Sequence, residues 1–207
     1  MPTNDSARPN LIQLPVEKFL ESVAGKSSTP GGGAVAAITG AQAAALISMV
    51  CHYSEKTEDL QTVLETATSA REIFLGLAQE DVASFESLMN AFSQAKESEG
   101  RARNIQSALV KAAEAPLKML SLSATLVDAV LILARQGNRN LITDLGMAAI
   151  LLSSCASSAE LNVLINLKGI KDQEYTRQIN ASISADKLTI SSLENIAPEI
   201  RTSLLTS

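Results

Sequence analysis

The architecture of this chain follows from residues 60–92, which read LQTVLETATSAREIFLGLAQEDVASFESLMNAF. Apolar side chains recur here at steps of three and four residues, the period of one face of an α-helix. They are Leu60, Val63, Leu64, Ala67, Ala70, Phe74, Leu77, Ala78, Phe85, Leu88 and Phe92. The pattern predicts one long helix that packs on other helices through this apolar stripe and breaks near residues 97–100.

Helical patterns also precede this segment. Pro15 suits the first position of a short helix that runs to about Ala24. An uncharged helix is expected over about residues 33–54, with small residues at every fourth position, so that a neighbouring backbone can approach closely. Residues 34–51 also approach the length of a membrane span, but their alanine content favours a helix buried inside a bundle.

Another long helical pattern follows, from about residue 101 to 136. Pro116 lies within it and is expected either to kink the helix or to start a new segment, because proline lacks the backbone N–H that a helix interior requires. Residues 117–134 are apolar nearly all round. We therefore expect them to form a central, buried helix.

The last third of the chain completes a helical fold. Gly137 suits a left-handed helix terminus, and Thr143 suits the cap of a helix that continues to about residue 167. A final helix is expected from about Gln173 until Pro198 disturbs its end. Alternating strand patterns and repeats of fixed period are absent from the sequence. The fold class is therefore all-α, a bundle of about six to eight long, partly buried helices.

Composition limits the function classes. The 207 residues suit a single domain, expected at residues 13–207, after a disordered tail at residues 1–12 that has no apolar core of a secretory signal. A net charge of -5 argues against a nucleic-acid partner. Cys51 and Cys155 lie in apolar runs without paired spacing, so we expect reduced, buried thiols and a cytoplasmic protein.

Asp81 is the most informative residue, because it interrupts the apolar stripe four residues after Leu77 and four before Phe85. Burial of an ionised carboxylate is costly, and a common response is a raised pKa that suits acid–base catalysis near neutrality. Two other interpretations stay open at this point: a buried ion pair with a basic residue of another helix, and a stripe that turns until Asp81 meets solvent.

Three other features could carry chemistry. The segment Ser28-Thr29-Pro30-Gly31-Gly32-Gly33 leads into a helix, so that its amides either face an anion or polar ligand or form only a turn. Asp144 is expected to complement a helix dipole. Asn162 and Asn166 share one helix face, where they either bind a heterocycle or bridge two helices. The lone His52 indicates no metal site.

Six short motifs occur in a specific order and spacing. They are Pro30-Gly31-Gly32-Gly33-Ala34-Val35-Ala36-Ala37, Met49-Val50, Asp81-Val82-Ala83-Ser84-Phe85, Pro116-Leu117, Gly137-Asn138 followed by Thr143-Asp144, and Asn162-Val163-Leu164-Ile165-Asn166-Leu167. Together they resemble the formiminotransferase-cyclodeaminase C-terminal domain family, which includes stand-alone cyclodeaminases and methenyltetrahydrofolate cyclohydrolases. The resemblance covers about residues 14–200.

This resemblance implies an all-helical homodimer that acts on one-carbon derivatives of tetrahydrofolate without a metal or redox cofactor. The charge and the alanine content described above favour neither a nucleic-acid nor a membrane partner. The resemblance places the catalytic aspartate at Asp81, in agreement with the interrupted stripe. The substrate-binding residues that it implies are Pro30, Gly31, Gly32, Gly33, Lys56, Asp144, Asn162 and Asn166. One departure is clear, because members commonly carry a basic segment after Met49-Val50, where this chain retains only Lys56.

The family chemistry leaves the reaction open. Formiminotetrahydrofolate cyclodeaminase is the first expectation, with the formimino group supplied by a separate formiminotransferase, and methenyltetrahydrofolate cyclohydrolase is the second. A folate-binding or interaction dimer without catalysis is a third possibility, motivated by the missing basic segment. A structural bundle without a ligand is the fourth, and Asp81 paired with an arginine, with no adjacent cavity, would favour it.

Overall fold

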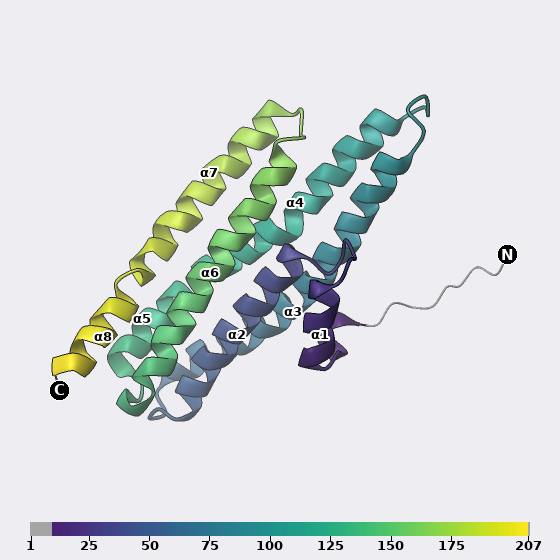
Figure 1. Cartoon of the computed structure of the whole chain (residues 1–207). Coiled ribbons are helices and arrows are strands. Elements are labelled where there is room, and N and C mark those ends of the chain that lie inside the picture. The colour runs from purple at the N-terminus through teal and green to yellow at the C-terminus, as the bar shows by residue number, and fades with distance from the viewer. Residues whose placement is uncertain (1–9, 207) are drawn as a thin grey trace.

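Four long helices form the core of the protein in the computed structural model, which describes residues 10–206 (Figure 1). They are α2 (Gly32–His52), α3 (Glu58–Ser93), α4 (Arg101–Thr125) and α6 (Ile142–Leu167). Helix α2 packs against α3 and α6, and α4 packs against the same two helices. The four therefore close into a single bundle, and the described residues contain no strand, which confirms the all-α class.

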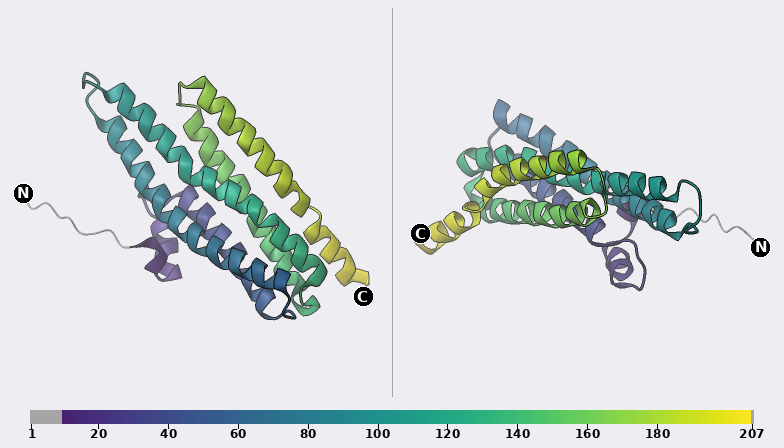
Figure 2. Two further views of the ribbon diagram at one scale, coloured as in Figure 1. Left: turned by 180° about the vertical axis from the view of Figure 1, so that it is seen from behind. Right: turned by 90° about the horizontal axis from the view of Figure 1, so that it is seen from above.

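The shorter helices lie outside this bundle. They are α1 (Val16–Ala24), α5 (Val127–Gln136), α7 (Gln173–Ile190), α8 (Ile196–Thr206) and the 3-10 helices η1 (Leu11–Gln13), η2 (Arg139–Leu141) and η3 (Ser191–Leu193). Helix α7 packs on α4 and α6, and α8 packs on α6. Helix α1 stands away from the bundle, on the side of the α2 amino terminus (Figure 2).

Helix α3 forms where the apolar stripe predicts it. The Thr57 hydroxyl caps its first turn by accepting a hydrogen bond from the Leu60 N–H at 3.2 Å. The stripe from Leu60 to Leu77 is buried against the bundle except for the half-buried Leu64, and the Phe74 side chain is fully enclosed. Towards the end of the helix the apolar stripe no longer predicts burial, because the Phe92 side chain is 44% exposed. Its side chain lines a cavity described below.

Helix α2 is the uncharged helix whose burial the sequence predicts. By length and composition alone it could cross a membrane, as could residues 101–136 and 139–167. In the structure α2 lies between α3 and α6, where Ala34, Ala37 and Ala44 have no exposed surface. Small side chains allow this close contact between helices, so that the high alanine content of α2 reflects its packing inside the bundle.

Helix length creates the space for a site. Helix α3 has 36 residues and α2 has 21, a difference of roughly 20 Å at 1.5 Å per residue. The hairpin of α3 and α4 and the end of α6 therefore extend beyond the start of α2 (Figure 1). At this end of the bundle the loop before α2 lies where a longer α2 would otherwise continue, and a cavity remains between this loop, α3, α4 and α6.

Some local expectations were wrong. Pro116 starts no new segment, because it lies inside α4, and the break between α4 and α5 falls at Leu126; the alternative of a kink stays a prediction. Gly137 is extended, with φ -73°, and is required for close approach, since a Cβ there would lie 2.5 Å from the Leu133 oxygen. Thr143 makes no cap, because α6 starts one residue earlier, after Leu141.

The amino-terminal prediction is corrected in part. Residues 1–9 of the expected tail lie outside the described residues. Residues 11 and 12 belong to η1, and the Leu11 side chain is buried. The Leu11 N–H also donates a hydrogen bond to Oε1 of Gln79 at 3.2 Å, which ties this segment to α3. Both Cys51 and Cys155 are free and buried, as expected.

Candidate functional site

A cavity of about 610 Å³ occupies the end of the bundle where α2 begins. Its walls come from the loop before α2, the second half of α3, the first half of α4 and the end of α6. The lining residues are Ser28, Thr29, Gly31, Gly32, Gly33, Asp81, Ser84, Phe85, Leu88, Met89, Phe92, Ile105, Leu109, Ala112, Asn162, Ile165, Asn166, Lys168 and Gly169. Four segments that are distant in sequence therefore meet around one hollow of ligand size.

Asp81 projects from α3 at the amino terminus of α2. Burial raises the pKa of its carboxyl to about 6, and a hydrogen bond from the Ala34 backbone N–H acts in the opposite direction. No salt bridge reaches Asp81 from any residue that the structure describes. The adjacent cavity and the missing cation argue against the interpretation of Asp81 as half of a structural ion pair.

The glycine loop makes this close approach possible. A Cβ built on Gly33 would overlap the carboxylate of Asp81, so that only glycine leaves room for it. Gly31, Gly32 and Gly33 line the cavity, and their binding of substrate stays a prediction. Pro30 is buried beside it and lines a second hollow of about 490 Å³. The Thr29 hydroxyl holds the loop on α3 through a 3.2 Å hydrogen bond to Glu86.

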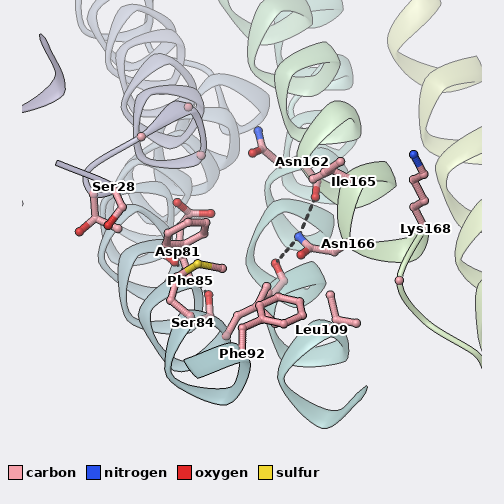
Figure 3. A pocket seen from close by; sticks show the side chains of 18 of the residues that line it. Ser28, Asp81, Ser84, Phe85, Phe92, Leu109, Asn162, Ile165, Asn166 and Lys168 are labelled. Carbon is pink, nitrogen blue, oxygen red and sulfur yellow. Dashed lines mark hydrogen bonds between the residues drawn. The ribbon is translucent and has the colours of Figure 1, made fainter. Parts of the chain in front are cut away.

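Asn162 and Asn166, which belong to α6, line the wall of the cavity opposite Asp81 (Figure 3). The Asn162 amide donates to the Ser158 oxygen at 2.8 Å. The Asn166 amide donates to the oxygens of Asn162 and Ala112, at 2.8 and 3.3 Å. Asn166 therefore both bridges α6 to α4 and faces the cavity, so the two alternatives considered for this pair are not exclusive.

Two predicted binding residues lie elsewhere. Lys56 lines a small hollow at the far end of α2, with neighbours that include Cys51 and Leu60. Asp144 lies in the first turn of α6, where its charge complements the helix dipole. Neither residue is part of the cavity that contains Asp81. The structure of one chain thus brings Asp81, the glycine loop and the two asparagines together, and leaves Lys56 and Asp144 apart.

The structure adds residues that the sequence did not single out. Phe85 and Phe92 were read as core residues but line the cavity, together with Met89. Lys168 is the one cationic side chain among its lining residues, and it pairs with no carboxylate in the described part of the chain. A signal for Lys168 was available, since it directly follows the motif that ends at Leu167.

These groups define what the cavity can do. An unpaired carboxyl with a pKa near 6 can both accept and donate a proton at neutral pH. Phe85, Phe92 and Leu109 offer apolar surface to a flat ring, and Lys168 offers a positive charge to an anionic tail. Among the described residues no group of three or more His, Cys, Asp or Glu side chains could hold a metal ion.

Comparison with a family model agrees with this geometry. The model described as formiminotransferase-cyclodeaminase matches residues 15–185. A methenyltetrahydrofolate cyclohydrolase from Methylorubrum extorquens is 37% identical over 174 residues, which are 79% of this chain and 84% of that protein. A formimidoyltransferase-cyclodeaminase from Sus scrofa is 32% identical over 85% of this chain, which spans only 35% of that longer protein.

A solved structure shows the same fold. The crystal structure of formiminotetrahydrofolate cyclodeaminase from Thermotoga maritima superimposes with a TM-score of 0.85 at 30% identity. The alignment covers 94% of this chain and 99% of that one. The helical arrangement is therefore shared over nearly the whole length of both chains.

Proposed function

We propose that this chain, which belongs to the formiminotransferase-cyclodeaminase family and is a folate one-carbon enzyme, is a methenyltetrahydrofolate cyclohydrolase. The observation that carries the proposal is the Asp81 carboxylate, which faces the cavity without a basic partner among the described residues and has a pKa of about 6. Such a group is available as a base at neutral pH. Its negative charge also complements a cationic one-carbon bridge.

The reaction needs two proton transfers that one carboxyl can perform. Asp81 accepts a proton from water as the water oxygen attacks the cationic methenyl carbon, which gives a neutral hydroxylated intermediate. The bond from this carbon to N5 then breaks. N5 takes the proton back from Asp81, and the hydroxyl proton leaves to solvent, so that 10-formyltetrahydrofolate and one proton are the products. General acid–base help of this kind contributes about 100-fold to 10,000-fold.

Sequence similarity favours the cyclohydrolase reaction, in which water attacks the methenyl carbon, over the cyclodeaminase reaction, in which ammonia leaves. The relative named as a cyclohydrolase shares 37% identity, and the chain covers 84% of its length. This reverses the order expected from the sequence, where cyclodeaminase was placed first. Cyclodeaminase remains the second candidate because the Thermotoga maritima neighbour, at 30% identity, carries that name. In that reaction N10 attacks the formimino carbon, and Asp81 passes the N10 proton to the departing ammonia.

The remaining expectations stay part of the proposal. The substrate is a tetrahydrofolate derivative, held with its ring between the aromatic side chains and the asparagines of the cavity. We expect a cytoplasmic homodimer that needs no metal or redox cofactor. A separate formiminotransferase is expected as a partner only if the protein is a cyclodeaminase.

The test is the absorbance of 5,10-methenyltetrahydrofolate, followed in both directions. Cyclohydrolase activity predicts decay of this compound above its spontaneous rate. Accumulation from 5-formiminotetrahydrofolate with release of ammonia would instead identify a cyclodeaminase. If neither reaction occurs but a folate raises the melting temperature, the protein is a binding module, and without such a shift the folate assignment fails.

A further inference from the structure

Pro116 leaves one carbonyl of α4 without its normal helical partner. In an α-helix each carbonyl accepts a hydrogen bond from the N–H four residues later. The partner of the Ala112 carbonyl would be residue 116, where proline has no N–H. Ala112 is buried and lines the cavity. A donor from another element is therefore needed to satisfy this oxygen.

Asn166 supplies that donor from α6. Its Nδ2 atom donates to the Ala112 oxygen at 3.3 Å and to the Asn162 oxygen at 2.8 Å (Figure 3). An asparagine amide has two N–H bonds, so that both are used. The opposite amide orientation would place Oδ1 against two carbonyl oxygens, which cannot donate. The two carbonyls therefore determine which end of the amide faces the ligand.

The free end is the acceptor, Oδ1. No described residue donates to this atom. It is also not buried, because no buried side-chain polar atom among the described residues lacks a partner. Since Asn166 lines the cavity, its oxygen is open to whatever the cavity binds. Asn162 lies one helical turn earlier on the same wall, and no described residue donates to its side-chain oxygen.

We propose that Pro116 is a positioning residue for this site: by freeing the Ala112 carbonyl it fixes the amide of Asn166, whose oxygen accepts a hydrogen bond from an N–H group of the ligand. Its ligand chemistry rests on the proposed function. The pteridine ring of a folate carries N–H groups that suit this acceptor, in its 2-amino group and at N3. The Pro116-Leu117 motif thereby acquires a role in recognition.

The first test is the variant Pro116→Ala, with 5-formyltetrahydrofolate as the probe. The new N–H gives the Ala112 carbonyl its normal helical partner, so that the Asn166 amide is held mainly by the Asn162 carbonyl and turns more freely. We expect the Kd of 5-formyltetrahydrofolate to rise about threefold to tenfold, which corresponds to the loss of about one hydrogen bond. The melting temperature should stay equal or rise, since proline is unfavourable inside a helix. Pro198→Ala, in the first turns of α8 away from the cavity, is the matched control and should leave Kd unchanged.

A double-mutant cycle with Asn166→Ala separates positioning from general packing. If Pro116 acts through Asn166, the loss caused by Asn166→Ala is smaller in the Pro116→Ala background than in the wild type. Full additivity of the two losses would overturn the proposal. A 2-desamino analogue of the same folate gives a second readout, because wild-type protein should bind it more weakly and Pro116→Ala should discriminate less.

Failure of the proposed function has a different signature. In that case the wild-type protein binds neither folate, and the orientation of Asn166 is then followed without a ligand, by hydrogen exchange of its side-chain amide in NMR spectra. Pro116→Ala should accelerate this exchange at least threefold relative to the wild type and to Pro198→Ala. Unchanged exchange would refute the role of Pro116, whatever the ligand.

Discussion

Asp81, the catalytic candidate, interrupts the apolar pattern of its helix. Its position on the apolar stripe of α3 would suit leucine, and a carboxylate there weakens packing. The structure shows that the side chain faces a cavity and the start of α2, and not a basic residue among those it describes. The loss of stability caused by the Asp81 carboxylate therefore accompanies a side chain that can exchange protons with a bound molecule.

The variant Asp81→Asn tests the chemistry. We expect turnover to fall by about 100-fold to 10,000-fold, while 5-formyltetrahydrofolate still binds, because the amide keeps the shape but cannot take a proton. In the wild type, kcat should fall as the pH decreases through about 6, since protonated Asp81 cannot act as a base. A rate profile that is flat from pH 5 to 8, or near-wild-type turnover of the variant, would remove Asp81 from the mechanism.

The same variant should be more stable at neutral pH. The Asp81 pKa is about 6 in the folded protein and about 3.9 in an unfolded chain, so that ionisation opposes folding above pH 6. This cost disappears as the pH falls from 6 to 4, where the folded state is protonated first. Urea denaturation of Asp81→Asn should therefore show a gain of about 2 kcal/mol at pH 7.5. A gain of equal size at pH 4 would contradict the electrostatic cause.

At the level of the helices, the contact between the start of α2 and the middle of α3 forms the reactive part of the cavity. The Ala34 N–H, in the first turn of α2, donates to the Asp81 carboxylate. First-turn N–H groups have no partner within their own helix, so that the carboxylate also satisfies α2. Gly33 permits this contact because it has no Cβ. One pair of helices thereby orients Asp81.

Gly33→Ala should therefore inactivate the enzyme. The added Cβ overlaps the Asp81 carboxylate, which must move, and displacement of a reacting group by about 1 Å can cost on the order of 100-fold in rate. Steady-state assays would measure the loss. Gly76→Ala is the control, because its Cβ meets no atom within 4 Å and alanine favours a helix over glycine by roughly 1 kcal/mol. Equal activity of the two variants would refute the role of the contact.

The end of α6 offers a second prediction, which concerns Lys168. This exposed cation lines the cavity beyond Asn166, where it could bind the carboxylates of a folate glutamate tail. Lys168→Glu should raise KM for a triglutamate substrate about fivefold at low salt, and less at high salt, because exposed charges are screened. The monoglutamate should be affected less. Lys171→Glu is the control, and an equal effect of both variants would exclude a specific subsite.

At the scale of the whole molecule, the described residues leave apolar side chains exposed on α6. Met147, Ile150, Leu161 and Ile165 repeat at helical spacing on the outer face of α6, and each is more than half exposed. Ile165 also lines the cavity, so that the surface adjoins the candidate site. This arrangement is compatible with the homodimer that the family resemblance implies, in which a second copy would cover α6.

Leu161→Glu tests this surface. A charge placed in a dimer interface of this kind should convert dimers into monomers in sedimentation velocity, without loss of helix content by circular dichroism. Leu188→Glu on α7, at a position that is 77% exposed and outside this face, is the control and should leave the assembly unchanged. A wild-type protein that is monomeric at micromolar concentration would contradict the expectation.

Local sequence patterns were sufficient for the helices and for the main catalytic candidate. Periodic apolar residues and small side chains predicted the bundle, because helix formation and burial of one face depend on neighbours three and four residues away. The interrupted stripe identified Asp81 for the same reason. The boundary between α4 and α5 at Leu126 was missed, since no glycine or proline marks it. The sequence pattern instead suggested a kink or a new segment at Pro116.

The composition of the site depended on packing between distant segments. Periodicity cannot distinguish Phe92 at the edge of a cavity from a core residue, and it cannot show that Lys168 lines the same cavity as Asp81 while Lys56 does not. These outcomes follow from the relative lengths of α2 and α3, which leave one end of the bundle open. The amino-acid sequence was thus enough for the helices and for the choice of Asp81 as the catalytic candidate. The cavity and the orientation of Asn166 depend on contacts between helices, which no local pattern encodes.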